Sequence, residues 1–236
     1  MDTDPSSSPV YFWRDSEPEG GYLSQWYPCA FSDDADPSIV YPTAEHYMMY
    51  QKALLFSDRA VGAQILAASH PRQVKALGRK VSNFDEKVWH AHREEIVRKG
   101  NWLKFTRPLD VNDGKWIITP PPPPSPAEGQ VDSSEGKGDG VSKAEGEGVS
   151  LKELLLRTGD RELVEASPMD RIWGIGFGAA RAGTVGRERW GLNLLGKALM
   201  AVRGELRRME EGGRQEGGRG QEKEESKGGE EEGDRV

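Results

Sequence analysis

Two stretches of this sequence are too poor in large apolar side chains to join a folded core, and they limit how the rest of the chain can fold. Residues 120–150 begin with a proline run and continue with mostly glycine, serine and charged residues, and residues 209–236 are similar but more highly charged. Ordering a residue costs roughly 1 to 2 kcal/mol, and these segments bury too little apolar area to offset that cost. We therefore predict that both stretches are disordered.

The predicted folded part runs from residue 10 to residue 208 and is interrupted by the segment 120–150. The piece after this insert has about 60 residues, and a unit of that size is only marginally stable alone. The sequence therefore favours one domain with a long insert over two separate domains.

Charge, cysteine content and hydropathy exclude several classes of protein. The chain has a formal net charge of -7, but the insert and the tail hold more negative charge than that, so the rest is weakly basic. A weakly basic surface is compatible with a phosphate-bearing ligand and too weak to indicate a nucleic-acid groove. The single cysteine, Cys29, excludes an internal disulfide. The sequence has no signal-peptide pattern or membrane-span pattern, so we expect a cytoplasmic protein without a membrane partner, with the nucleus as the alternative location.

The apolar periodicity predicts a helix-dominated α+β fold with a small β element near the start. Short strands are expected at 10–13 and 38–41, where aromatic and β-branched residues cluster. Helices are expected at 44–56, 57–69, 72–81, 85–105, 150–160 and 190–209. Thr43, Ser57 and Ser150 are the expected N-cap residues of three of these helices.

The predicted helix 44–56 carries an acid and an amine that could act together. Glu45 lies in its first turn, where a carboxylate also simply stabilises the positive end of the helix. Lys52 lies two turns further along the same face, roughly 10 Å away. Because its neighbours are mostly apolar, Lys52 is expected to be partly buried, and burial lowers a lysine pKa toward the nucleophilic range.

The segment 165–178, EASPMDRIWGIGFG, combines a carboxylate, an indole and alternating glycines. Asp170 is either a turn-capping residue or a functional acid. Trp173 is the tryptophan expected to stack on a base, and Gly174 and Gly176 would let a ligand approach the main chain. The spacing does not match the dinucleotide-binding fingerprint.

The histidines do not indicate a metal site. His90 and His92 would point about 200° apart on a helix and cannot share a metal ion. We therefore predict neither a metal nor a cofactor.

Five strings, in this order, resemble the NADAR (YbiA-like) family of N-glycosidases: YLSQWYP, YPTAEHYMMYQKALLF, GNWLKFTRP, LLLRTGDRELVEASPMDRIWGIGFG and WGLNLLGKALMAVRGEL. The resemblance covers residues 11–110 and 150–206 and implies a single YbiA-like domain. It implies cleavage of a ribose C1–nitrogen bond in a small phosphoribosyl or ADP-ribosyl substrate: a riboflavin-pathway phosphoribosylamino-pyrimidine, or ADP-ribosyl-guanine. ADP-ribosylated nucleic acid is a further alternative, which the basic residues Arg98, Lys99, Lys104 and Arg107 could serve.

The resemblance also suggests roles for individual residues. Glu45, Lys52 and Asp170 are the implied catalytic residues, and the implied substrate-binding residues are Ser24, Trp89, Trp173, Gly174, Gly176 and Asn193. Gln25 departs from the Ser-Asn pair of many members.

Two mechanisms and a second function remain open. In the first mechanism Lys52 attacks C1 to form a Schiff base while Glu45 moves protons and Asp170 positions the ribose. In the second, Glu45 activates a water molecule and Lys52 only binds phosphate. The alternative function is a non-catalytic module that binds ADP-ribose or a nucleotide.

Overall fold

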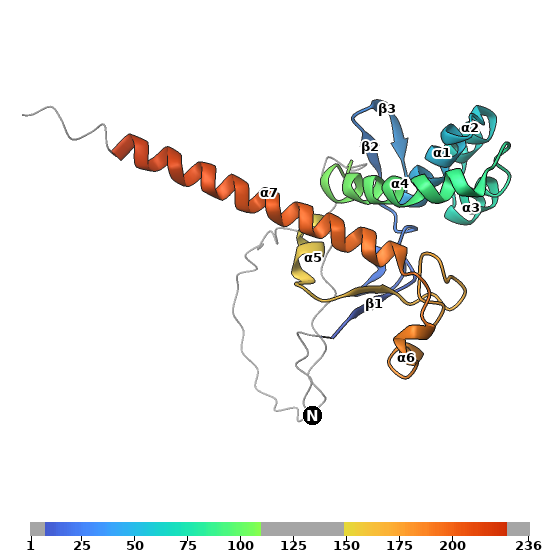
Figure 1. The fold of residues 1–236 in the computed structure, drawn as a ribbon. Coiled ribbons are helices and arrows are strands. Elements are labelled where there is room, and N and C mark those ends of the chain that lie inside the picture. Colours follow the sequence, from blue (N-terminus) through green and yellow to red (C-terminus); the bar gives the residue numbers. More distant parts are fainter. Residues whose placement is uncertain (1–7, 110–148, 226–236) are drawn as a thin grey trace, which may run out of the picture.

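The computed structural model describes residues 8–109 and 149–225, with the side chains of the last helix described through residue 212. Most of the predicted insert and the end of the predicted tail lie outside these ranges. The described chain is helix-dominated with two small sheets, which confirms the predicted α+β class (Figure 1).

Each sheet has two strands. Strand β1 (Val10–Phe12) pairs in parallel with β4 (Leu163–Glu165), so the first and second pieces of the chain share a sheet. Strand β2 (Phe31–Asp33) pairs in antiparallel fashion with β3 (Asp36–Tyr41). The strands expected at 10–13 and 38–41 are confirmed, whereas β2 and β4 were not predicted.

The helices follow the predicted order. They are α1 (Ala44–Leu55), α2 (Arg59–Ala67), α3 (Pro71–Gly78), α4 (Glu86–Thr106), α5 (Leu151–Arg157), the short α6 (Ala179–Ala182) and α7 (Leu194–Glu225), with 3-10 turns η2 (Gly21–Leu23) and η3 (Arg187–Arg189). None of the helices in the described ranges has the length and apolar character that crossing a membrane requires.

Two of the three predicted caps are confirmed. The side chain of Thr43 accepts a hydrogen bond from the His46 amide, and Ser150 caps α5 through the Glu153 amide. The prediction for Ser57 is wrong by one residue, because Asp58 caps α2 while Ser57 adopts a left-handed conformation with φ 59°.

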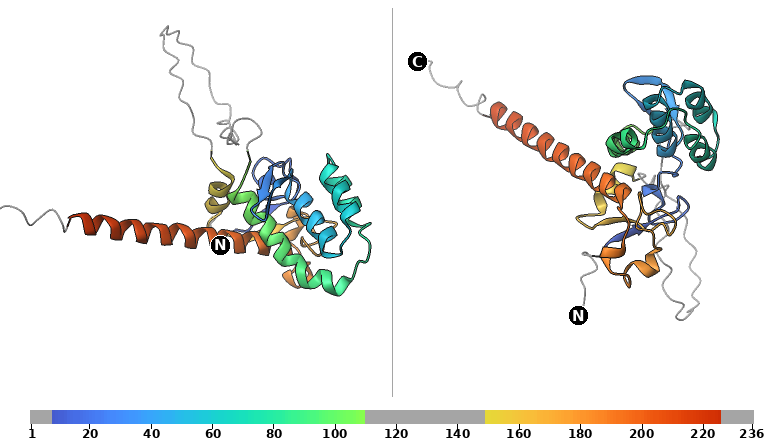
Figure 2. Two further views of the ribbon diagram at one scale, coloured as in Figure 1. Left: turned by 90° about the horizontal axis from the view of Figure 1, so that it is seen from above. Right: turned by 45° about the vertical axis from the view of Figure 1, so that its right-hand side comes forward.

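Helix α7 differs from the prediction at both ends. It begins at Leu194 rather than at 190, because Gly191 and Leu192 donate main-chain hydrogen bonds to the segment after β4, and Asn193 is left-handed with φ 50°. It continues to Glu225, well past the predicted boundary at 209, and its second half extends away from the other elements (Figures 1 and 2).

The main core brings both pieces of the chain together. Helix α4 packs against α1 on one side and α7 on another, and α7 also packs against β4. Side chains from both pieces, such as Ile65, Val97, Leu155 and Leu199, are fully buried in one cluster. In Figures 1 and 2, the loops that follow β4 lie beside the beginning of α7.

Candidate active site

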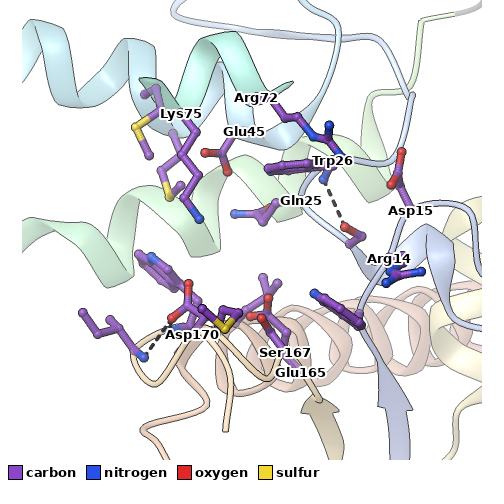
Figure 3. A pocket seen from close by; sticks show the side chains of 18 of the residues that line it. Arg14, Asp15, Gln25, Trp26, Glu45, Arg72, Lys75, Glu165, Ser167 and Asp170 are labelled. Carbon is purple, nitrogen blue, oxygen red and sulfur yellow. Dashed lines mark hydrogen bonds between the residues drawn. The ribbon is translucent and has the colours of Figure 1, made fainter. Parts of the chain in front are cut away.

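A cavity of about 1090 Å³ lies between α1, α3, the segments 13–16 and 24–26, and the segment 165–173 (Figure 3). Its lining includes the three indoles of Trp13, Trp26 and Trp173. A cavity of this size with several aromatic walls is suited to a ligand larger than a single sugar.

Four carboxyl groups line the cavity: Asp15, Glu45, Glu165 and Asp170. Figure 3 shows Glu45 on one side of the cavity and Glu165 and Asp170 on the opposite side. Glu45 has only 4% of its surface exposed, and its Oε1, like Oε2 of Glu165, is buried without a hydrogen-bond partner. Two glutamates, each with one buried and unpaired carboxyl oxygen, therefore line the same cavity from opposite sides.

The environment keeps both glutamates protonated up to unusually high pH. Burial raises the pKa of Glu45 to about 7; the charge of Asp170 adds to the shift, while Lys75 and the Trp26 side chain oppose it. Burial also raises the pKa of Glu165 to about 8, with Asp170 and Glu45 adding to the shift and Lys75 opposing it. Carboxyl groups that exchange a proton near neutral pH are suited to acid–base chemistry.

Asp170 combines the two interpretations that the sequence left open. Its Oδ1 accepts hydrogen bonds from the amides of Ile172 (2.9 Å) and Trp173 (2.8 Å), as a turn-capping aspartate does. The same side chain lines the cavity and is close enough to Glu45 and Glu165 to raise both pKa values.

Segment 24–26 is held from behind by α4 and supports Glu45. The Lys104 ammonium donates to the Ser24 carbonyl (2.8 Å), and the Asn101 amide donates to Oε1 of Gln25 (3.2 Å). The Glu45 amide donates to the Gln25 carbonyl (3.0 Å), and the Trp26 side chain lies close enough to the Glu45 carboxyl group to lower its pKa. Gln25, the residue that departs from the family pattern, is thus part of this support.

Five cations line the cavity: Arg14, Arg72, Lys75, Arg79 and Arg171. Three of them come from α3 and the residue that follows it, at positions that repeat along one face of the helix. Planar guanidinium groups bind phosphate through paired hydrogen bonds, so this part of the lining is suited to a phosphorylated ligand.

The structure brings together four of the predicted site residues. Ser24, Glu45, Asp170 and Trp173 all line the cavity.

Lys52 and Trp89 are not part of the cavity lining. The Lys52 ammonium instead donates to the Gly78 carbonyl (2.8 Å) and lies over the rings of Phe84 (4.3 Å) and Trp89 (5.4 Å). The amine that lies near Glu45 is that of Lys75, so the expected pairing of Glu45 with Lys52 is not what the geometry provides.

The predicted glycines and Asn193 shape the segment behind the cavity. A Cβ at Gly174 would lie 2.6 Å from the Glu165 carbonyl oxygen, and Gly176 is left-handed with φ +77°. In the Asn193 side chain, Oδ1 accepts a hydrogen bond from the main-chain amide of Glu165 (3.0 Å) and Nδ2 donates to the Leu163 carbonyl (2.9 Å). These residues lie outside the lining and hold β4, which carries Glu165.

Sequence reasoning missed Glu165, Trp26 and the cations of α3. A lone acid within the apolar run LVEA was a usable signal for Glu165, because an acid in a buried strand requires a reason. Cations at 72, 75 and 79 recur on one face of a predicted helix, which was a signal for an anion-binding surface.

The basic residues expected to serve a nucleic acid are already engaged. Arg98, Lys99 and Arg107 each pair with a carboxylate at 2.6 to 2.9 Å, and Lys104 is fully buried.

Fold and cavity together define a single-domain α+β protein with a pocket lined by carboxyl groups, cations and indoles. The chain belongs to the NADAR family, since the NADAR domain matches residues 11–207. This confirms the resemblance seen in the sequence.

Several relatives carry the name of an activity. An N-glycosidase of Acanthamoeba polyphaga mimivirus is 34% identical, with 83% of this chain and 95% of the relative covered. An N-glycosidase of Nostoc punctiforme is 28% identical, with 85% of this chain and 94% of the relative covered. A riboflavin biosynthesis protein of Vibrio vulnificus is 27% identical over 84% of this chain and 38% of its own length.

A solved structure shares the fold. The NMR structure of the E. coli protein YbiA superposes with a TM-score of 0.56 at 24% identity, covering 86% of this chain and 88% of YbiA. The likeness extends over most of both chains and supports the assignment to one YbiA-like domain.

Proposed function

We propose that this protein is a hydrolase of N-glycosyl bonds that cleaves the bond between ribose C1 and nitrogen in a phosphorylated base–ribose compound. The observation that carries this proposal is that Glu45 and Glu165, each with one buried and unpaired carboxyl oxygen, line one cavity. The names of the mimivirus and Nostoc relatives support the same reaction class.

Cleavage of an N-glycosyl bond requires a proton for the departing nitrogen and stabilisation of positive charge on the sugar. Glu165 has the higher pKa, about 8, and is assigned as the acid that protonates the nitrogen. Glu45, with a pKa of about 7, takes the proton of the attacking water. The water oxygen bonds to C1 while the C1–N electron pair leaves with the nitrogen, and Asp170 faces the sugar as it becomes positively charged.

The other parts of the lining match the other parts of such a substrate. An indole offers a flat surface on which a base can stack, and Trp26 and Trp173 flank the acids. Arg72, Lys75 and Arg79 provide positive charge for phosphate groups. The substrate is thus proposed to be a phosphoribosylamino-pyrimidine of the riboflavin pathway, as the name of the Vibrio relative suggests, or ADP-ribosyl-guanine, free or in nucleic acid.

The test is to incubate the purified protein with both substrate types and detect the free base and the released sugar phosphate by mass spectrometry. The wild type should release base from at least one substrate, and Glu45→Gln should bind that substrate without releasing base. Glu94→Gln, a change at an exposed acid of α4, is the matched control. Wild-type protein that binds ADP-ribose but releases no base would establish the non-catalytic module instead.

Borohydride trapping separates the water route from an amine route. In the amine route a lysine displaces the base at C1, the ring opens to an imine, and water later releases the sugar. Lys75 is the lysine positioned in the cavity for that step. We expect no borohydride adduct during turnover; an adduct would identify Lys75 or Lys52 as the nucleophile by peptide mapping.

A further inference from the structure

Lys52 joins three helices at one point. Its ammonium donates to the carbonyl of Gly78, the last residue of α3, at 2.8 Å. The last carbonyls of a helix have no partner within the helix, and a lysine near them satisfies both the hydrogen bond and the negative end of the helix. The same ammonium lies over Phe84, which follows α3, and over Trp89 of α4.

The contact between α1 and α3 is tight where Lys52 makes this bond. A Cβ added at Gly78 would overlap the side-chain sulfur of Met49, and Val74 of α3 is fully buried. Met49 also lines the cavity. Helix α3 can approach α1 this closely because position 78 has no side chain, and the Lys52 bond fixes the end of α3 in this position.

The position of α3 determines where the cavity's cations lie. Arg72, Lys75 and Arg79 all come from α3 or its C-cap. Lys75 is near enough to Glu45 and Glu165 to lower both pKa values, against the raising effects of burial and Asp170. A small shift of α3 away from α1 would therefore change both the charge around the acids and the phosphate-binding surface.

We infer that Lys52 is a positioning residue: it holds the C-terminus of α3 against α1, so that Arg72, Lys75 and Arg79 face the cavity. It acts through α3 and is not the nucleophile. This inference rests on the proposed function for its effect on turnover, while its effect on the carboxyl groups can be measured without any substrate.

The substrate-free test compares Lys52→Met with Lys52→Arg by carbon-13 NMR titration of glutamate side chains. Lys52→Met removes the hydrogen bond, so Lys75 should move away and the apparent pKa values of Glu45 and Glu165 should rise; Asp170 and Trp26, which also face Glu45, are unchanged. Lys52→Arg keeps a cation that can reach the Gly78 carbonyl and stack on both rings, so its titration should match the wild type. Lys80→Met, at an exposed lysine just past α3, is the matched control.

Calorimetry with ADP-ribose and ribose 5-phosphate provides a second readout. Lys52→Met should weaken binding about tenfold, which corresponds to about 1.4 kcal/mol, while Lys52→Arg and Lys80→Met should bind like the wild type. Identical titration curves and affinities for Lys52→Met and the wild type would overturn the inference.

The conservative variant distinguishes a positioning residue from a nucleophile, even if Lys52→Met does not fold. Arginine cannot form a Schiff base, so a Lys52→Arg protein with near-normal turnover supports the positioning role. A Lys52→Arg protein with a wild-type titration curve and no turnover would assign Lys52 to the chemistry and overturn the inference. If the wild type cleaves no substrate but Lys52→Met still shifts the carboxyl titration, the proposed function fails and the positioning role stands.

Discussion

The site depends on two glutamates placed where a carboxyl group is costly. Burying an ionised carboxylate without a partner is so unfavourable that the group takes up a proton instead. Glu45 and Glu165 each keep one buried oxygen without a hydrogen-bond partner and have raised pKa values of about 7 and about 8. Such an arrangement weakens the fold at neutral pH and prepares the groups for proton transfer.

Changing Glu165 to glutamine should remove the proton donor while keeping the shape of the side chain. We expect kcat to fall by about 10² to 10⁴-fold with little change in KM, because general acid catalysis commonly contributes that much. Steady-state kinetics on the substrate found by mass spectrometry measure this. The control Glu94→Gln should retain normal kinetics, and an only severalfold loss in Glu165→Gln would assign the acid role to another group.

Lys75 should set the pH range of activity. The assigned mechanism requires Glu45 ionised and Glu165 protonated, so kcat/KM should rise with pH near 7 and fall near 8, the two limbs belonging to the coupled pair. Lys75 lowers both pKa values, so Lys75→Met should move both limbs to higher pH. A pH–rate profile of the variant that coincides with the wild-type profile would show that this charge does not control the acids.

Only part of this site could be predicted from the sequence. Glu45 was found because its helix and its family pattern are local features. Glu165 lies in β4, which pairs with β1 far away in the sequence, so the environment that buries its Oε2 is a tertiary property. Lys52 shares a helix with Glu45, yet its side chain turns toward Gly78, because α3 packs there.

At the scale of elements, α4 supports the segment 24–26 that carries Trp26. Lys104 is fully buried in α4, and its ammonium lies 5.5 Å from the Tyr27 ring and 2.8 Å from the Ser24 carbonyl oxygen. Burial lowers the pKa of Lys104 to about 8. A buried amine that binds the main chain behind the cavity fixes the position of Trp26 beside Glu45.

Lys104→Met should therefore impair activity more than stability. Because the pKa of Lys104 is lower in the folded protein, the wild type loses stability as pH falls from about 10.5 through about 8. Methionine carries no charge, so the variant does not have this loss at neutral pH. The substitution also leaves the Ser24 carbonyl without its hydrogen-bond partner, which lowers stability. We expect kcat/KM to drop at least tenfold, with a change in unfolding free energy of no more than about 2 kcal/mol. Kinetics and denaturant unfolding at pH 7 measure both.

The comparison variant is Lys99→Met, five residues earlier on α4, which removes the ion pair between half-exposed Lys99 and buried Asp33. Asp33 keeps its hydrogen bonds from the Tyr47 hydroxyl and the Ala35 amide, so this change should lower stability by about 1 to 2 kcal/mol and leave activity unchanged. A Lys104→Met protein with normal turnover would show that α4 does not hold segment 24–26 in its active position.

Element boundaries were predictable where the signal is local. Caps at Thr43 and Ser150 follow from side chains that bond to nearby amides, and both were predicted. The beginning of α7 was not, because Gly191 and Leu192 are recruited by main-chain bonds to the segment after β4. The strand β4 was missed because three residues give too short a pattern to recognise.

At the scale of the whole molecule, the cavity exists only when both pieces of the chain are folded together. Glu45, Trp26 and the cations of α3 come from the first piece, and Glu165 and Asp170 come from the second. The parallel pairing of β1 with β4 and the packing of α4 on α7 join them. This agrees with the prediction of one domain with an insert, and it means that global unfolding separates the two acids.

Global stability should therefore report the titration of the acid pair. Each glutamate has a folded pKa above its ordinary value of 4.5, so the stability that it contributes is fully present below about pH 4.5 and is lost as pH rises through about 7 to 8. Glu45→Gln/Glu165→Gln stays neutral throughout and lacks this loss. Its unfolding free energy, relative to the wild type, should rise between pH 4.5 and 8 by at most about 1.4 kcal/mol per pH unit for each carboxyl group.

Denaturant unfolding of both proteins from pH 4.5 to 9 tests this expectation. Other groups titrate in the same range, among them His46, whose pKa burial lowers, but they are present in both proteins and cancel in the difference. Glu94→Gln should run parallel to the wild type at every pH. If the unfolding free energy of the double variant also runs parallel to that of the wild type at every pH, the two carboxyl groups titrate as exposed acids do. Acids with ordinary pKa values in this cavity could not supply the proton that the leaving nitrogen needs.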